Sequence, residues 1–143
     1  QGVPILVGLT AGVEPAPVVL KVGDRNKAAA LHAQAKAAQG EAAAKLLQQA
    51  VEADPTFVDA RLTLAATWRS LKKPAEAEAI LKETMRGMPD VVQTYAALGE
   101  LYEEQGRWSE AEDVYQRSLK ANPNQPPMYQ GLDRVRGKMK KKP

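Results

Sequence analysis

The stretch that decides the fold is VQTYAALGELYEEQGRWSEAEDVYQRSLKANPNQ, which runs from Val92 to Gln125. The proline near its end, Pro123, follows Pro89 by 34 residues, and Pro89 follows Pro55 by the same 34 residues. This interval relates three further sets of positions: Ala43, Ala77 and Ala111; Leu47, Leu81 and Tyr115; Ala50, Thr84 and Ser118. A period of this length indicates a stack of similar two-helix units that bury a continuous core between neighbours.

The spacing of small and large residues predicts two helices in each unit. Small residues such as Ala65 and Gly99 let two helix axes approach closely, and the large residues Trp68 and Tyr102 are expected to fill the core beside them. Each repeated proline ends a second helix, because it lacks an N–H group and clashes with the preceding turn. We predict helices at 24–39, 41–53, 57–71, 74–86, 91–105, 108–120 and 126–139, the last as a cap.

These residues resemble the tetratricopeptide repeat family, most clearly in the unit 92–125. The resemblance implies an all-α, right-handed superhelical solenoid of antiparallel helix pairs. It divides the chain into a non-helical aliphatic segment (1–23), three units, and a capping helix with a basic tail (126–143); the units are 24–57, 58–91 and 92–125. The first unit matches mainly in its second half, and Gly40 follows the expected turn position by two residues. The register of its first helix is therefore left open.

The resemblance also implies where a partner binds. In this family the first helices of successive units line a concave face, and that face commonly holds a peptide or protein. The matching protein-binding positions are Asp59, Leu62, Thr63, Ala66, Arg69, Gln93, Ala96, Ala97, Glu100, Glu103, Glu104 and Arg134. Small side chains at several of them leave room for a segment with bulky apolar anchors.

One subfamily binds the acidic C-termini of heat-shock chaperones through a clamp of Lys, Asn and Arg side chains. The matching positions of this chain carry none of those residues: Ala28, His32, Thr63, Gln93 and Ala97. We therefore predict that the chain is not a carboxylate-clamp cochaperone.

The composition argues against an enzyme. The 143 residues contain no cysteine and one histidine, His32, so a thiolate nucleophile, a thiolate metal site and a multi-histidine zinc site are excluded. His32 has no serine nucleophile with an orienting carboxylate beside it in the sequence pattern. Glu100, Glu103 and Glu104 form an acidic helical face, and we favour a partner-facing surface over a site for a hard cation. We expect no enzymatic activity and no cofactor or metal.

The charge is unevenly distributed along the chain. The net charge is +3 overall, −3 in the unit 92–125 and +5 after residue 125, where four lysines lie between Lys138 and Lys142. Attraction of this tail to anionic lipid is one interpretation, and a solvated helix end is the favoured one. The tail lacks interleaved aromatic residues, which argues against nucleic-acid binding.

Residues 3–20 are rich in aliphatic side chains although their prolines and glycines exclude a regular helix. Such a segment favours burial. Three interpretations stay open: a cap on the first unit, a segment that lies in the groove of its own or a neighbouring chain, and the remainder of another domain. The compartment is unknown, and Gln1 in place of methionine slightly favours an exported location such as the bacterial periplasm over the cytoplasm.

We therefore predict a non-enzymatic protein–protein interaction scaffold that binds a peptide or protein partner in its concave groove. The alternative is a self-associating structural protein, a homo-oligomer formed through residues 3–20.

Overall fold

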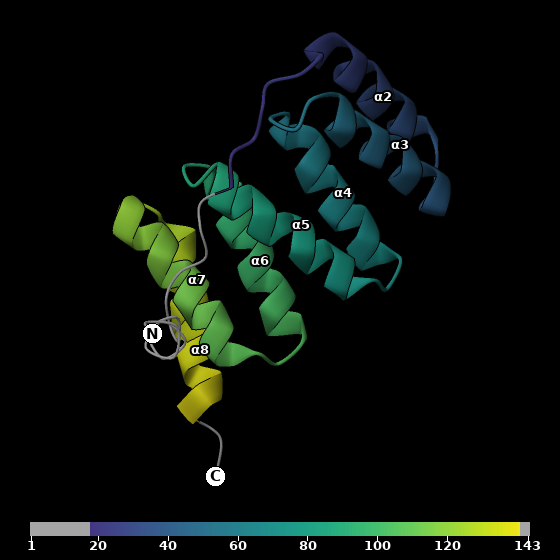
Figure 1. Cartoon of the computed structure of the whole chain (residues 1–143). Coiled ribbons are helices and arrows are strands. Elements are labelled where there is room, and N and C mark those ends of the chain that lie inside the picture. The colour runs from purple at the N-terminus through teal and green to yellow at the C-terminus, as the bar shows by residue number, and fades with distance from the viewer. Residues whose placement is uncertain (1–17, 141–143) are drawn as a thin grey trace, which may run out of the picture.

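The computed structural model describes residues 18–140, and this part of the chain forms seven α-helices and no β-strand. Figure 1 shows them in a row in chain order, each antiparallel to the next. Their bounds are α2 Arg25–Ala37, α3 Gly40–Ala53, α4 Val58–Ser70, α5 Pro74–Gly87, α6 Val92–Glu104, α7 Trp108–Ala121 and α8 Pro126–Lys140. The predicted all-α helical repeat solenoid is confirmed, and every predicted helix bound lies within two residues of the observed one.

The repeat governs the helix bounds themselves. The helices α3, α5 and α7 begin at positions 40, 74 and 108, and α4 and α6 begin at 58 and 92, so that the interval between the prolines recurs in both series. Counting the same interval back from the start of α4 gives position 24, and α2 begins at position 25. The first helix therefore follows the repeat closely, whereas the division of the chain into units 24–57, 58–91 and 92–125 stays a prediction.

The turns between paired helices need a left-handed residue. Lys72 and Gly106, which are equivalent positions of successive repeats, have φ angles of 62° and 71°. The residue that follows each donates its backbone N–H to a carbonyl of the preceding helix, at 2.8 Å from Lys73 to Trp68 and 2.9 Å from Arg107 to Tyr102. Because glycine adopts positive φ without steric cost, Lys72 holds the same turn at an energetic disadvantage.

Two glycines make room for one buried ring. Tyr115 on α7 is 2% exposed and lies between Gly99 on α6 and Gly131 on α8. A Cβ added to Gly99 would lie 2.5 Å from Tyr115 Cζ, and one added to Gly131 would lie 2.7 Å from Tyr115 Cε2. This confirms that small residues admit a large one at the helix contact.

The corner after each of the first two repeated prolines is held by a side chain of the next helix. Arg61 donates from Nε to the Pro55 carbonyl at 2.6 Å, and Tyr95, its equivalent in the next repeat, donates its hydroxyl to the Pro89 carbonyl at 2.9 Å. Arg61 is 2% exposed and pairs with Glu83 at 2.7 Å. Sequence analysis did not single out Arg61 as a buried residue.

The segment before α2 is attached to the ends of two helices. Gly23 donates to Asp54 Oδ1 at 3.1 Å, and Asp24 donates to the Ala53 carbonyl at 2.8 Å, both at the end of α3. Leu20 lies against Gly87 at the end of α5. Residues 18–23 are non-helical, and residues 3–17 of the predicted aliphatic segment lie outside the described residues.

Candidate binding surface

Helices α2, α4, α6 and α8 form one continuous layer. Within residues 18–140 each of these helices contacts the next one in that order, whereas α3, α5 and α7 contact only the helices of the first layer. A stack whose inner helices touch and whose outer helices are spread apart curves toward the inner layer. All twelve predicted protein-binding residues belong to α4, α6 and α8, so they lie in this layer.

The predicted protein-binding residues differ in exposure. The exposed ones are Asp59, Ala66, Gln93, Glu100, Glu104 and Arg134, and the half-buried ones are Leu62, Thr63, Arg69, Ala96, Ala97 and Glu103. None is fully buried, so each presents some surface to a partner. Whether a partner uses them stays a prediction.

The predicted acidic face of α6 is paired with arginines of both neighbouring helices. Arg69 of α4 bonds to Glu104 and lies 3.8 Å from Glu100. Arg134 of α8 bonds to Glu103 at 3.0 Å. The face is therefore a row of alternating charges rather than a free acidic patch.

Glu103 is the most strongly held member of this row. It accepts hydrogen bonds from Arg134 and from the Tyr115 hydroxyl. Partial burial by itself would raise the pKa of Glu103, but these two donors outweigh it and keep the pKa below its usual range. Burial first, and then the bond to Glu103, raises the pKa of Tyr115, so its hydroxyl remains a donor at neutral pH.

Two shallow depressions lie along the inner layer, one near each end. The first, of about 280 Å³, is lined by Lys36, Thr63 and Ser70 among others. The second, of about 490 Å³, is lined by Glu104, Arg134 and Lys138 among others. Lys36 and Glu104 are two repeats apart, and so are Ser70 and Lys138, so the depressions are equivalent places in the solenoid.

Two of the positions that match a carboxylate clamp, His32 and Thr63, contact each other. His32 Nε2 lies 3.1 Å from Thr63 Oγ1, and the ring of His32 meets Phe57 edge-on at 5.5 Å. Ala28 is fully buried. This end of the face offers no fixed cation at the clamp positions to an acidic peptide.

Two polar side chains of the stack, those of Ser118 and His32, are each held by a neighbouring side chain. Ser118 is buried and bonds to Gln125 at 3.0 Å, and His32 bonds to Thr63. Among residues 18–140 no three acidic or histidine side chains are grouped so as to hold a metal ion. In the same range, no helix has the length and the hydrophobicity that crossing a bilayer requires.

The outer face, opposite the inner layer, carries a pocket that the repeat pattern does not indicate. Trp68 and Tyr102 were both expected in the core, and Tyr102 is there, with 3% of its surface exposed. Trp68 is instead half-buried at the base of a pocket between α3 and α5. Trp68 packs against the core but is less buried than its repeat equivalent Tyr102, because the residues beside the ring differ between the two units.

Comparisons with known proteins agree with this architecture. A family model described as tetratricopeptide repeat matches residues 34–90 and 69–134. No curated protein matches the sequence.

Solved structures of the same fold come from different proteins. The first tetratricopeptide domain of Spaghetti (RPAP3), bound to the HSP90 peptide SRMEEVD, is 22% identical, covers 81% of this chain and 98% of its own, and has a TM-score of 0.70. The Arabidopsis OM64 domain is 20% identical, covers 80% of this chain and 98% of its own, and has a TM-score of 0.67. MamA is 20% identical, covers 78% of this chain and 63% of its own, and has a TM-score of 0.66.

Identities this low show the fold alone, whereas the family model spans well over half of the chain. The fold is that of a protein–protein interaction scaffold. The chain belongs to the tetratricopeptide repeat family.

Proposed function

We propose that the chain is a non-enzymatic binding module that holds a segment of a partner protein along the inner layer of α2, α4, α6 and α8. One observation carries the proposal: these four helices touch in order and bring half-exposed alanines and a row of alternating charges onto one surface. A segment with apolar anchors and both charge signs would suit it, because opposite charges fix the register of a bound chain.

The proposal excludes an acidic chaperone tail as the ligand. The peptide SRMEEVD is bound by the Spaghetti domain. Here the positions that the resemblance matches to a carboxylate clamp are occupied by Ala28, His32, Thr63, Gln93 and Ala97, and His32 and Thr63 contact each other. We expect no measurable binding of SRMEEVD to this chain in isothermal calorimetry.

The site is tested with peptides selected from a displayed library on the native chain. We expect Ala66→Trp, which fills the inner face, to weaken the selected peptides about tenfold or more. The control is Ala42→Trp on α3, since Ala42 is also an exposed helical alanine but lies in an outer helix. Selected peptides that bind Ala66→Trp and the native chain equally would place the site elsewhere and overturn the proposal.

We propose self-association as a second candidate, because two aliphatic side chains of the N-terminal segment 1–23 are exposed. Val19 is 83% exposed and Val22 is 80% exposed. Light scattering after a sizing column should show an oligomer for the full chain and a monomer for the chain without residues 1–22. The oligomer should persist at high salt because the contact is apolar. A monomer in both cases refutes this candidate.

A further inference from the structure

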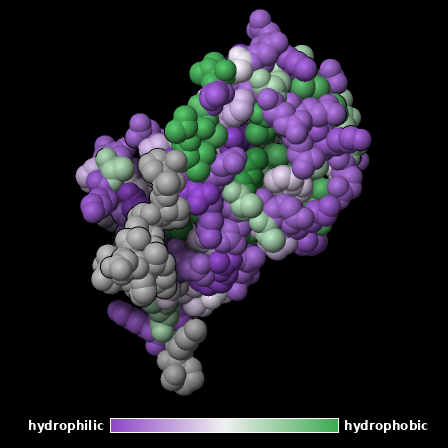
Figure 2. All heavy atoms as spheres, viewed as in Figure 1, coloured by the Kyte–Doolittle hydropathy of each residue, from purple (hydrophilic) through white to green (hydrophobic). Residues whose placement is uncertain are grey.

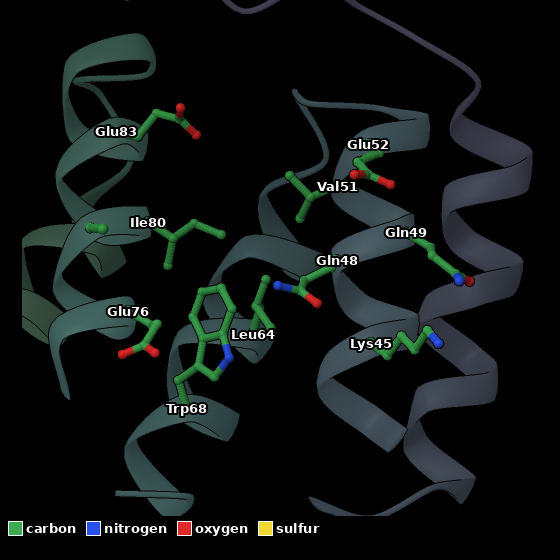
Figure 3. A pocket seen from close by; sticks show the side chains of 11 residues that line it. Lys45, Gln48, Gln49, Val51, Glu52, Leu64, Trp68, Glu76, Ile80 and Glu83 are labelled. Carbon is green, nitrogen blue, oxygen red and sulfur yellow. The ribbon is translucent and has the colours of Figure 1, made fainter. Parts of the chain in front are cut away.

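The outer face carries a pocket that the proposed function does not use. It lies between α3 and α5 above α4 and has a volume of about 590 Å³. Figure 3 shows the Trp68 ring and the Leu64 side chain rising from α4 into the space, with Ile80 on one wall and Val51 on the other. In Figure 2 hydrophobic surface is visible in the region between α3 and α5, flanked by hydrophilic side chains. The pocket therefore has an apolar floor that water can reach.

The next repeat contains the equivalent place, and there the aromatic ring is covered. That pocket, of about 430 Å³, lies between α5 and α7, with Tyr102 in the position of Trp68. The Tyr102 hydroxyl donates to Glu78 at 3.0 Å, and the Arg107 guanidinium lies over its ring, 4.4 Å from the centroid. Arg107 in turn bonds to Glu78 at 2.7 Å.

One repeat earlier this cover is absent. The residues that stand one repeat before Glu78 and Arg107 are Ala44 and Lys73. Ala44 cannot form an ion pair, and Lys73 is directed to Glu41, at 2.9 Å. The Trp68 indole consequently lacks the cover that Arg107 gives to Tyr102, and it stays half-buried.

The two equivalent pockets also differ in charge. The charged residues that line the pocket above Trp68 are three acids and one base: Glu52, Glu76, Glu83 and Lys45. Those that line the pocket above Tyr102 are three bases and two acids: Lys82, Arg86, Arg117, Glu110 and Asp113. Glu83 is neutralised by Arg61 at 2.7 Å, whereas Glu52 and Glu76 are exposed on opposite sides of the apolar floor. With Glu83 paired, Glu52 and Glu76 face one base, Lys45, so the rim of the pocket above Trp68 is weakly acidic.

We propose that this pocket, called here the Trp68 pocket, binds a short peptide segment of a partner in which a bulky aliphatic residue is flanked by lysine or arginine. The aliphatic side chain packs on the half-buried Trp68 and Val51, and its cationic neighbours lie beside Glu52 and Glu76. The indole face adds a cation–π contribution for a flanking Lys or Arg. The amide side chains of Gln48 and Gln49 also line the pocket and can bond to a peptide backbone. This is a second binding surface, separate from the inner layer.

The test uses Trp68 itself as the reporter. The chain has two tryptophans, and Trp108→Phe leaves Trp68 as the single indole fluorophore. The ligand is an acetylated, amidated peptide of alternating lysine and leucine, and its control is the same peptide with glutamate in place of lysine. We expect a saturable blue shift of the Trp68 emission with the lysine peptide and none with the glutamate peptide. Anisotropy of the labelled lysine peptide on the native chain repeats the titration without substitution.

Two variants locate the binding. Ala79 is an exposed residue of the pocket wall on α5, and Ala79→Leu fills the pocket. We expect it to weaken the lysine peptide about tenfold or more, and the double variant Glu52→Lys with Glu76→Lys to do the same. The matched control is Asp113→Leu, since Asp113 is the exposed equivalent of Ala79 in the next pocket, and it should leave the affinity unchanged.

Three results would overturn the proposal. Equal binding of the lysine and glutamate peptides would remove the charge argument. Unchanged binding to Ala79→Leu, with Ala66→Trp weakened instead, would assign the peptide to the inner layer. A blue shift of Trp68 that grows with protein concentration without any peptide would make a second copy of the chain the occupant.

Discussion

A methyl group added at Gly99 should destabilise the solenoid through a single ring. The added Cβ would lie 2.5 Å from Tyr115 Cζ, whereas carbon atoms in contact stay about 3.5–4.0 Å apart, so the ring would have to move by about 1 Å. It cannot move freely toward α8, because a Cβ position at Gly131 is only 2.7 Å from its other edge. Overpacking of this kind costs about 1–3 kcal/mol, against which alanine gains about 1 kcal/mol of helix propensity over glycine.

We expect Gly99→Ala to lower the free energy of unfolding by about 2 kcal/mol, because Tyr115 is enclosed on both sides. The matched control is Gly137→Ala on α8, where an added Cβ meets nothing within 4 Å. That variant should raise the stability by about 0.5–1 kcal/mol from propensity alone. Urea denaturation followed by far-UV circular dichroism measures both on the same scale.

A double variant separates crowding from any other effect at Gly99. In the preceding repeat Leu81 occupies the position of Tyr115, and Ala65 occupies that of Gly99. Tyr115→Leu should therefore relieve Gly99→Ala, with a coupling free energy of about 1–2 kcal/mol. Additive effects of Gly99→Ala and Tyr115→Leu on the free energy of unfolding would show that crowding of the ring does not cause the loss. A Gly99→Ala variant as stable as Gly137→Ala would refute the reasoning in the same way.

Three further sets of variants test the turns and the buried charges by urea denaturation. Lys72→Gly should stabilise the chain by about 0.5–1 kcal/mol, because glycine adopts the left-handed conformation without strain. Gly106→Lys should destabilise it by about 1–2 kcal/mol for the same reason, and two variants that change the stability in the same direction would refute the turn argument. Arg61→Ala should cost about 3 kcal/mol, whereas Arg61→Tyr should cost less because Tyr95 holds the same corner; an equal loss would show that the charge matters rather than the corner bond. The hydrogen bond from Arg107, foremost among its partners, lowers the pKa of Glu78 to about 2 from 4.5, so Glu78 stabilises the fold above pH 4.5 and that stability is lost as the pH falls toward 2. Glu78→Gln should therefore be less stable by about 1–2 kcal/mol at pH 7, with allowance for solvent screening, and the difference should vanish near pH 2; a constant difference would exclude the charge as its cause.

The helix bounds could be predicted from the sequence because the residues that end helices and the residues that pack between them recur at the same period. A proline such as Pro89 and a turn glycine such as Gly106 mark where helices end, and the alternation of Gly99 with Tyr115 marks which faces meet. Each is a local rule, and the repeat applies each rule several times along the chain. Errors at one unit are therefore corrected by the others.

The properties of individual side chains could not be predicted in the same way. Glu103 and Glu104 count as an acidic face in the sequence, but their charge is balanced by Arg134 and Arg69 from the two neighbouring helices of the layer. The repeat makes Trp68 equivalent to the buried Tyr102, but its burial depends on whether a cover equivalent to Arg107 is present. Such pairings depend on which side chains meet across the stack. The repeat pattern does not specify them, because it records only what the units have in common.

The attachment of residues 18–24 also determines how the module would respond to force. Tension applied to the chain ahead of residue 18 would first meet the contact of Leu20 with Gly87, and then the bonds from Gly23 and Asp24 to the end of α3. The helix α2, which buries only Ala28 and Ala35, would carry tension only after those bonds had broken. A molecule pulled from this side would therefore keep α2 in the stack until those bonds had broken, and the inner layer would keep its curvature.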